Sequence, residues 1–172
     1  MTLGSIESAS AKPRSLLWLV VFGGAAALTS GLGAWATRRG RGAWYRALAK
    51  PAGQPPNEVF GPLWTTLYGL MSVSAYRVFR APPSPRRTRA LFLWWSQLAL
   101  NGGWSPLFFG AHRARWALAD LAALTGTVAV YTRTAARVDP AAAWLMVPYL
   151  GWLGYAGWLN VEIVRRNPRL AG

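Results

Sequence analysis

The sequence predicts an all-α integral membrane protein, a bundle of five transmembrane helices. Hydrophobic residues make up 53% of the 172-residue chain and charged residues only 14%. Five apolar stretches each have about the 20 residues that a helix needs to cross a bilayer, and none shows the strict alternation of a barrel strand. The basic residues lie mainly between these stretches. We therefore expect membrane-spanning helices at 16–36, 59–79, 90–110, 114–134 and 142–164.

The net charge of +14 does not indicate nucleic-acid binding. A nucleic-acid-binding domain gathers its arginines and lysines on one folded face, whereas here apolar spans separate them. We expect these loop charges to meet the anionic headgroups of the lipid bilayer. They are nearly balanced between the two sides of a five-span bundle, so the orientation stays open. The chain has no cysteine, which excludes disulfides and thiol chemistry.

The first apolar stretch follows a polar N-terminal extension at 1–14. No small-residue cleavage site follows it, so we interpret it as a retained helix and not as a signal peptide. Gly23, Ala27 and Gly31 recur at four-residue spacing, which favours close packing against another helix.

The loop at 37–56 is rich in proline and arginine. Pro51, Pro55 and Pro56 fix backbone angles and remove amide donors, so residues 49–56 should be extended. Trp44 and Tyr45 could lie on the bilayer surface or fold back as a lid, and the sequence favours the surface.

The second helix can begin only after Pro56, with Asn57 as its N-cap. An aromatic face then follows at positions i, i+3, i+4 and i+7, formed by Trp64, Leu67, Tyr68 and Met71.

The third stretch places a polar residue in the middle of a span. Asn101 is costly against lipid, so it should point into the bundle. There it bonds another helix or the carbonyls freed by Pro106, or it meets a ligand; we favour the structural role. A kink is expected near Gly102 and Gly103.

The fourth and fifth stretches add an acid and a second aromatic stripe. Asp120 is an acid inside a span, which makes it a functional candidate, although pairing with Arg113 or Arg115 is the interpretation we favour. In the fifth stretch Pro148 should bend the helix. It precedes a broad stripe of Tyr149, Trp152, Ala156, Leu159 and Asn160.

Several kinds of catalytic site have no counterpart in the sequence. There is no HExxH motif, no phosphate-binding glycine loop and no acid pair placed for hydrolysis. The single histidine, His112, falls in a short loop, which argues against a Ser/His nucleophile and against an internal haem ligand. A bound tetrapyrrole would be held by stacking and not through its metal.

Four blocks of sequence resemble one known family. They are WYRALAKPAGQPPNEVFGPLWTTLYGLM, QLALNGGWSPLFFG, WALAD and PYLGWLGYAGWLN, beginning at residues 44, 97, 116 and 148. In this order and spacing they resemble the TspO/translocator protein family, which includes the tryptophan-rich sensory proteins of bacteria and the mitochondrial translocator protein. The resemblance covers about residues 15–167, which we take as one domain followed by a tail at 168–172.

The resemblance implies a five-helix membrane bundle, usually a homodimer, whose ligand cavity is closed by the loop after the first helix. Family members bind porphyrins such as protoporphyrin IX, haem, sterols and synthetic ligands. No cofactor is required, and porphyrin or haem would be a ligand. Carried over residue by residue, the binding site comprises Trp64, Asn101, Trp104, Trp116, Trp152, Ala156 and Leu159, with Trp44, Pro55 and Pro56 in the lid.

One departure from the family bears on sterols. Animal members end the fifth helix with a cholesterol-recognition pattern, but Val161 stands here where that pattern has tyrosine, so sterol binding is doubtful. Two looser matches, Val73-Tyr76-Arg80 and Val128-Tyr131-Arg133, are weak patterns.

We therefore expect a porphyrin-binding receptor or transporter-like protein with a sensory role, in a bacterial envelope membrane and not in the mitochondrial outer membrane. The alternatives are a light-dependent porphyrin-degrading enzyme that uses Trp64 and Trp152, and a proton-coupled exporter that uses Asp120. Homodimerisation is expected through Ala99 and Gly103 of the third helix, with Gly23, Ala27 and Gly31 as the second possibility.

Overall fold

The computed structural model describes residues 13–170, and within that range it contains helices and no strand. The predicted all-α class is confirmed. The elements are α1 (Pro13–Gly40), α2 (Ala43–Ala47), α3 (Asn57–Arg80), α4 (Pro85–Ser105), the π-helical turn η1 (Pro106–Gly110), α5 (Ala114–Ala135), α6 (Pro140–Trp144) and α7 (Val147–Arg166). The expected extension at 1–14 lies outside the described residues, apart from its last two, which begin α1.

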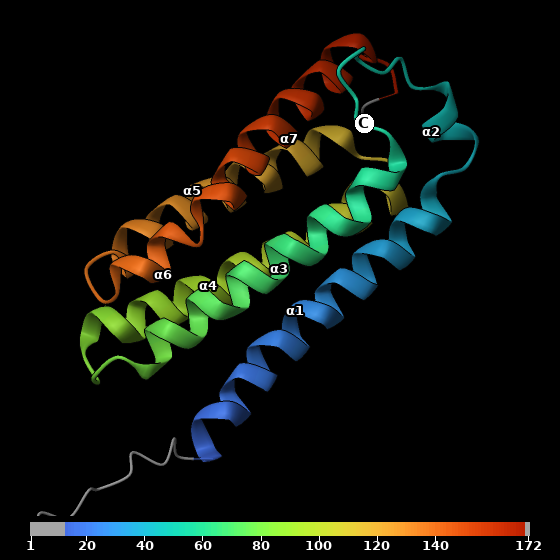
Figure 1. The fold of residues 1–172 in the computed structure, drawn as a ribbon. Coiled ribbons are helices and arrows are strands. Elements are labelled where there is room, and N and C mark those ends of the chain that lie inside the picture. The colour runs from blue at the N-terminus through green and yellow to red at the C-terminus, as the bar shows by residue number, and fades with distance from the viewer. Residues whose placement is uncertain (1–12, 171–172) are drawn as a thin grey trace, which may run out of the picture.

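The five long helices lie side by side in an elongated bundle (Figure 1). The C-terminal end of α1, the short helix α2, the start of α3 and the C-terminal end of α7 gather at one end of it (Figure 1). The segment from α2 to α3 therefore covers that end of the bundle.

Prolines and caps set several helix boundaries. Pro85 and Pro140 stand at the starts of α4 and α6, where a missing N–H costs little. Ser84 caps α4 by accepting from the Arg87 N–H, and Asp139 caps α6 by accepting from two backbone N–H groups. These boundaries follow directly from local sequence.

Three local predictions were wrong. The stretch at 142–164 is divided into α6 and α7, and Pro148 is the second residue of α7 instead of the bend in a continuous helix. The helix α3 starts at Asn57 itself, with Pro56 in the cap position. Helix α4 runs through Gly102 and Gly103, and the irregularity comes at Pro106, where the Ala111 N–H donates to the Pro106 carbonyl in a π-helical bond.

The core joins helices through buried aromatic and polar side chains. Trp94 of α4 is fully buried, and its Nε1–H donates to the Met71 carbonyl of α3 at 3.0 Å. Ser74 of α3 lies 2.7 Å from the Tyr131 hydroxyl of α5 and donates to the Ala142 carbonyl at 2.7 Å. The polar atoms of Trp94, Ser74 and Tyr131 therefore each have a partner on a neighbouring helix, as an apolar surrounding favours.

One helix in the described residues is long and apolar enough to be recognised as a membrane span by composition: Leu16–Gly40, with a mean hydropathy of 1.8. The other long helices carry large apolar side chains on their outer faces, including Phe92, Trp116, Val130 and Trp158.

Candidate functional site

A cavity of about 450 Å³ lies inside the bundle at the end covered by the α2–α3 segment. Residues from α1, α3, α4, η1, α5 and α7 line it, together with Tyr45 and Gln54 of the covering segment. Its volume falls in the range of about 300–1,000 Å³ that is usual for small-molecule sites.

The cavity wall is aromatic. Trp64 of α3 and Trp152 of α7 touch edge to face, with ring centroids 6.0 Å apart and planes at 83°. Trp104 of α4 stacks on Phe108 at 5.0 Å and 12°. Because Trp64 and Trp152 already touch, a flat ligand can lie between them only if one of the two rings rotates.

Asn101 ties three helices together beside the cavity. Its Oδ1 accepts from the Tyr68 hydroxyl of α3 at 2.5 Å, and its Nδ2 donates to the Tyr149 hydroxyl of α7 at 2.7 Å. Of the roles considered for this residue, interhelical bonding is the one these contacts support, and the carbonyls near Pro106 are not its partners. Asn101 also lines the cavity.

Asp120 does not pair with the arginines expected for it. Among residues 13–170 no basic group lies within ion-pair distance of its carboxylate, and Arg115 donates instead to the Pro168 carbonyl at 3.2 Å. Asp120 faces α4: a Cβ atom added to Gly103 would lie 3.6 Å from its Oδ1. Its Oδ2 is buried without a hydrogen-bond partner, so the favoured ion-pair interpretation was wrong.

Trp44 and Tyr45 fold back onto the bundle, and the favoured surface placement was wrong. The Trp44 ring stacks on His112 at 4.5 Å and meets Phe108 edge-on at 5.6 Å, while its Nε1–H donates to the Leu170 carbonyl at 3.1 Å. Tyr45 lines the cavity, and its hydroxyl accepts from Gln54 Nε2 at 3.0 Å.

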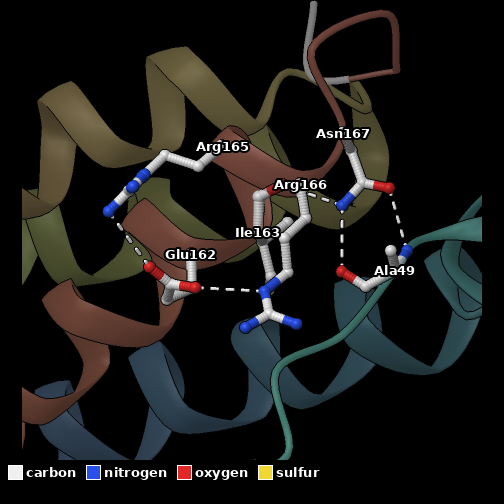
Figure 2. A network of polar contacts seen from close by, with 6 residues as sticks. All are labelled: Ala49, Glu162, Ile163, Arg165, Arg166 and Asn167. Atoms are coloured by element: carbon white, nitrogen blue, oxygen red, sulfur yellow. Dashed lines mark hydrogen bonds and ion pairs between the residues drawn. The ribbon is translucent and has the colours of Figure 1, made fainter.

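The covering segment is fixed to the end of α7 by Asn167, which sequence reasoning missed. Asn167 Oδ1 accepts from the Ala49 N–H at 2.8 Å, and its Nδ2 donates to the Ala49 carbonyl at 3.0 Å and to the Ile163 carbonyl at 2.8 Å (Figure 2). Tyr155 of α7 adds a bond from its hydroxyl to the Gly53 carbonyl. We call this contact set, Ala49 and Gly53 with Asn167 and Tyr155, the lid clamp.

The cavity brings together most of the predicted site residues, but not all. Those that line it are Trp64, Asn101, Trp104, Trp152, Ala156 and Leu159. Trp44, Pro55 and Pro56 belong to the covering segment without lining the cavity. Trp116 is 61% exposed on the outside of α5, because Ala114, Ala117, Leu121 and Leu124 turn the opposite face inward.

Sequence reasoning also missed the contribution of α1. Its C-terminal half supplies one wall of the cavity, through Ser30, Gly33, Ala34, Thr37 and Arg38. The three- and four-residue spacing of Ser30, Gly33, Ala34 and Thr37 was the available signal. The sequence interpretation considered only the neighbouring packing stripe of Gly23, Ala27 and Gly31.

The sequence is similar to one protein family and to several of its members. The sequence model of the TspO/MBR family matches residues 17–166. The translocator protein of Homo sapiens is 41% identical over 126 residues, covering 72% of this chain and 75% of that protein. Protein CrtK of Rhodobacter capsulatus is 40% identical over 128 residues, covering 74% and 80%. The tryptophan-rich sensory protein of Cereibacter sphaeroides is 41% identical over 124 residues, covering 72% and 77%.

Proposed function

The chain belongs to the TspO/MBR family of membrane proteins, and from this premise we propose that it binds a porphyrin-like, flat apolar ligand in the bundle cavity as part of a sensory or regulatory role. The observation that carries the proposal is the aromatic wall of Trp64, Trp104 and Trp152 around about 450 Å³ of space. Planar π-systems gain stacking and edge-to-face contacts against such a wall.

The proposal includes five membrane spans. Helices α1, α3, α4, α5 and α7 have 20 to 28 residues each, or about 30 Å or more at about 1.5 Å per residue, which matches the hydrocarbon thickness of a bilayer. Phe92 and Trp116, exposed at 70% and 61%, are costly in water and suited to lipid. Placement in a bacterial envelope membrane is part of the proposal, and the bacterial relatives of 34–41% identity are consistent with it.

Aromatic contact, not metal ligation, would hold the ligand. His112, the single histidine, stacks on Trp44 and is not among the residues that line the cavity. Retention of a tetrapyrrole would therefore rely on its ring and on its substituents.

A binding experiment in the dark and in light tests the proposal. Purified protein in phosphatidylcholine nanodiscs should show saturable quenching of tryptophan fluorescence by protoporphyrin IX. Ala156→Leu, which fills cavity space, should weaken binding about tenfold, while Ala119→Leu, the same change at an exposed position of α5, should not. Absence of saturable binding by folded protein would refute the proposal.

The same preparation separates the two alternatives. Loss of the porphyrin absorption band with new products under light, abolished by Trp64→Phe or Trp152→Phe, would assign the enzyme. Accumulation of porphyrin in proteoliposomes that depends on a proton gradient and is abolished by Asp120→Asn would identify the protein as an exporter. The observation that favours this alternative is the Asp120 carboxylate, whose Oδ2 has no hydrogen-bond partner among the described residues.

A further inference from the structure

Arg87, in the first turn of α4, is held against aromatic rings at the end of the bundle opposite to the cavity. Its guanidinium carbon lies 4.9 Å from the centre of the Phe79 ring at the end of α3. The Phe79 ring lies 4.5 Å from the Trp18 ring of α1, and Trp18 is 38% exposed. Three helices therefore contribute to one site, in which an arginine stands over a partly exposed pair of rings.

The charge of Arg87 has no partner within residues 13–170. Its Nε is buried without a hydrogen-bond partner, and the ion pairs in this range involve Arg77, Arg165 and Arg166 instead. Asp139, the one acid in this range that lies at the same end of the bundle, pairs with Arg77 at 3.0 Å (Figure 1). A partly buried charge without a counter-ion is unfavourable, so the site is suited to an anion from outside the chain.

The surroundings of Arg87 are also cationic. Arg86 and Arg89 are exposed on the same helix, and the guanidinium of Arg80 lies 5.8 Å from the centre of the Tyr76 ring. These charges attract an anion and repel a cation that approaches with it. A headgroup with a net negative charge is therefore favoured over one whose phosphate carries its own positive group.

An apolar surface continues from Arg87 towards the middle of the bundle. Buried Phe22 of α1 lies 6.1 Å from the Trp18 ring and 5.9 Å from the Trp95 ring of α4. Trp18 and Trp95 are 38% and 41% exposed. Trp95 follows Arg87 by two helical turns, or about 12 Å at about 1.5 Å per residue. A cation at the bundle end is thus followed by aromatic surface at the depth where acyl chains lie.

We propose that this surface, formed by Trp18, Phe22, Phe79, Arg87 and Trp95 and called here the Arg87 site, binds one phospholipid with a net negative headgroup. The phosphate lies on the guanidinium, and an acyl chain lies along Trp18 and Trp95. This inference goes beyond the proposed function: it requires that α1, α3 and α4 lie in a membrane, and it does not involve the cavity.

Stacking makes Arg87 different from the other basic residues at the membrane surface. An aromatic ring under the guanidinium fixes its plane, and a planar guanidinium forms parallel N–H bonds to phosphate oxygens. Such charge-assisted bonds are about twice as strong as neutral ones. General attraction between loop charges and headgroups needs no aromatic support, so the stacked arginine indicates a defined site.

Phosphatidylglycerol and phosphatidylcholine with the same acyl chains form the test pair, since both contain a phosphate and they differ in net charge. Native mass spectrometry of the full chain in detergent measures how many lipids bind and how tightly. One phosphatidylglycerol should bind at least about tenfold more tightly than phosphatidylcholine, or about 1.4 kcal/mol. An excess of inorganic phosphate should not displace it, because the free ion lacks the acyl-chain contacts.

Three variants assign the effect to the Arg87 site. Arg87→Gln should lower the affinity for phosphatidylglycerol to that for phosphatidylcholine. Phe79→Leu keeps the charge but removes the ring beneath it, and should weaken binding about two- to fivefold, as expected for a cation–π contact of about 0.5–1 kcal/mol. Arg137→Gln is the matched control: it removes the same charge from an exposed position at the same end of the bundle, and should change the affinity less than about twofold.

Equal affinity of the wild type for the two lipids, an equal loss in Arg137→Gln, or displacement by inorganic phosphate would overturn the inference. Each of these results leaves the proposed function standing, because protoporphyrin binding is titrated separately and should be unchanged in Arg87→Gln. Absence of porphyrin binding with phosphatidylglycerol retained would instead remove the proposed function alone. If thermal unfolding shows that Arg87→Gln does not fold, the lipid preference of the wild type and the effect of Phe79→Leu decide.

Discussion

Trp64 and Trp152 are the residues on which the proposed binding depends most directly. Their edge-to-face contact is compact, and a ligand must insert beside it or turn one ring. Replacing either tryptophan with phenylalanine should weaken protoporphyrin binding by about 0.5–1.5 kcal/mol, or roughly 2- to 12-fold, since stacking area is lost while the core remains filled. Titration by absorbance measures the affinity, and thermal unfolding measures the stability.

Trp116→Phe is the matched control for this pair. The ring of Trp116 is exposed on the outside of α5, so its replacement should leave affinity unchanged. An equal loss of affinity in all three variants, or melting shifts without any loss of affinity, would contradict a binding role for Trp64 and Trp152.

Asp139 is a residue whose structural role predicts a pH dependence. It caps α6 through bonds from the Ala141 and Ala142 N–H groups at 2.9 and 3.2 Å, and it pairs with Arg77 of α3 at 3.0 Å. Partial burial raises the pKa of this carboxyl, but the hydrogen bonds and charge of Arg77 and the two backbone N–H groups outweigh it, so the pKa lies below its usual range.

A lowered pKa means that the folded state favours the ionised form. The stabilisation is complete above the unfolded pKa of about 3.9 and is lost as pH falls through the lower folded pKa. Asp139→Ala should therefore cost about 1 kcal/mol for the cap and up to about 1 kcal/mol for the ion pair at neutral pH, and should reduce the acid sensitivity of unfolding. Arg77→Gln keeps the cap and should therefore lower the free energy of unfolding by less than Asp139→Ala does. An equal loss in the two variants would mean that the whole effect comes from the ion pair.

At the scale of elements, the lid clamp determines how the cavity is covered. Asn167 bonds both polar groups of the Ala49 backbone, so its side chain replaces the backbone partner that an extended segment otherwise lacks (Figure 2). Asn167→Ala should lower the free energy of lid opening by about 1–3 kcal/mol, for two lost bonds of about 0.5–1.5 kcal/mol each. Hydrogen exchange of the amides at 49–54 should speed up more than about fivefold.

Glu162→Gln provides the control for the clamp. Glu162 pairs with Arg165 and Arg166 on the same end of α7 and makes no bond to the covering segment (Figure 2). The Glu162→Gln variant should leave the hydrogen exchange of the covering segment unchanged. If Asn167→Ala has no greater effect than Glu162→Gln, the clamp does not hold the lid.

The elements also bear on where a second copy could dock. Gly103 packs toward Asp120 of α5 in the same chain, whereas Ala99, on the same helix, is exposed. Ala99→Leu should therefore weaken a homodimer built on α4, while Ala119→Leu on α5 should not. Light scattering in detergent measures the oligomer, and an unchanged dimer in Ala99→Leu would shift the interface to the groove of Gly24, Ala27, Leu28, Gly31 and Leu32 on α1.

At the scale of the whole molecule, no cavity side chain offers an axial bond to iron from histidine, because His112 lies against Trp44 instead. Metal-free protoporphyrin and haem should therefore bind with affinities within about tenfold, or 1.4 kcal/mol. Parallel titrations of the two ligands measure the ratio. A much tighter haem complex whose Soret shift disappears in His112→Ala would contradict this expectation.

The sequence by itself determined the helical class and most of the inward-facing stripes. Apolar runs near 20 residues indicated helices, although the expected starts at 90 and 142 lie after the observed starts of α4 and α6 at Pro85 and Pro140. The stripes on α3 and α7 identified Trp64 and Trp152, because helical periodicity places residues three and four apart on one face. Asn101 was identified as a polar residue in the middle of an apolar span. These are local properties, so the sequence contains them directly.

The tertiary structure alone decided which side chains meet across the chain. Trp116 points outward because alanines and leucines of α5 turn the other face to the core. Asn167 bonds to Ala49, which lies 118 residues away in the sequence. Arg38 lines the cavity and Arg39 does not, because only one face of α1 lies against the cavity. Such pairings depend on the relative rotation and depth of packed helices, which no local pattern encodes, since they follow from the close packing of all side chains at once.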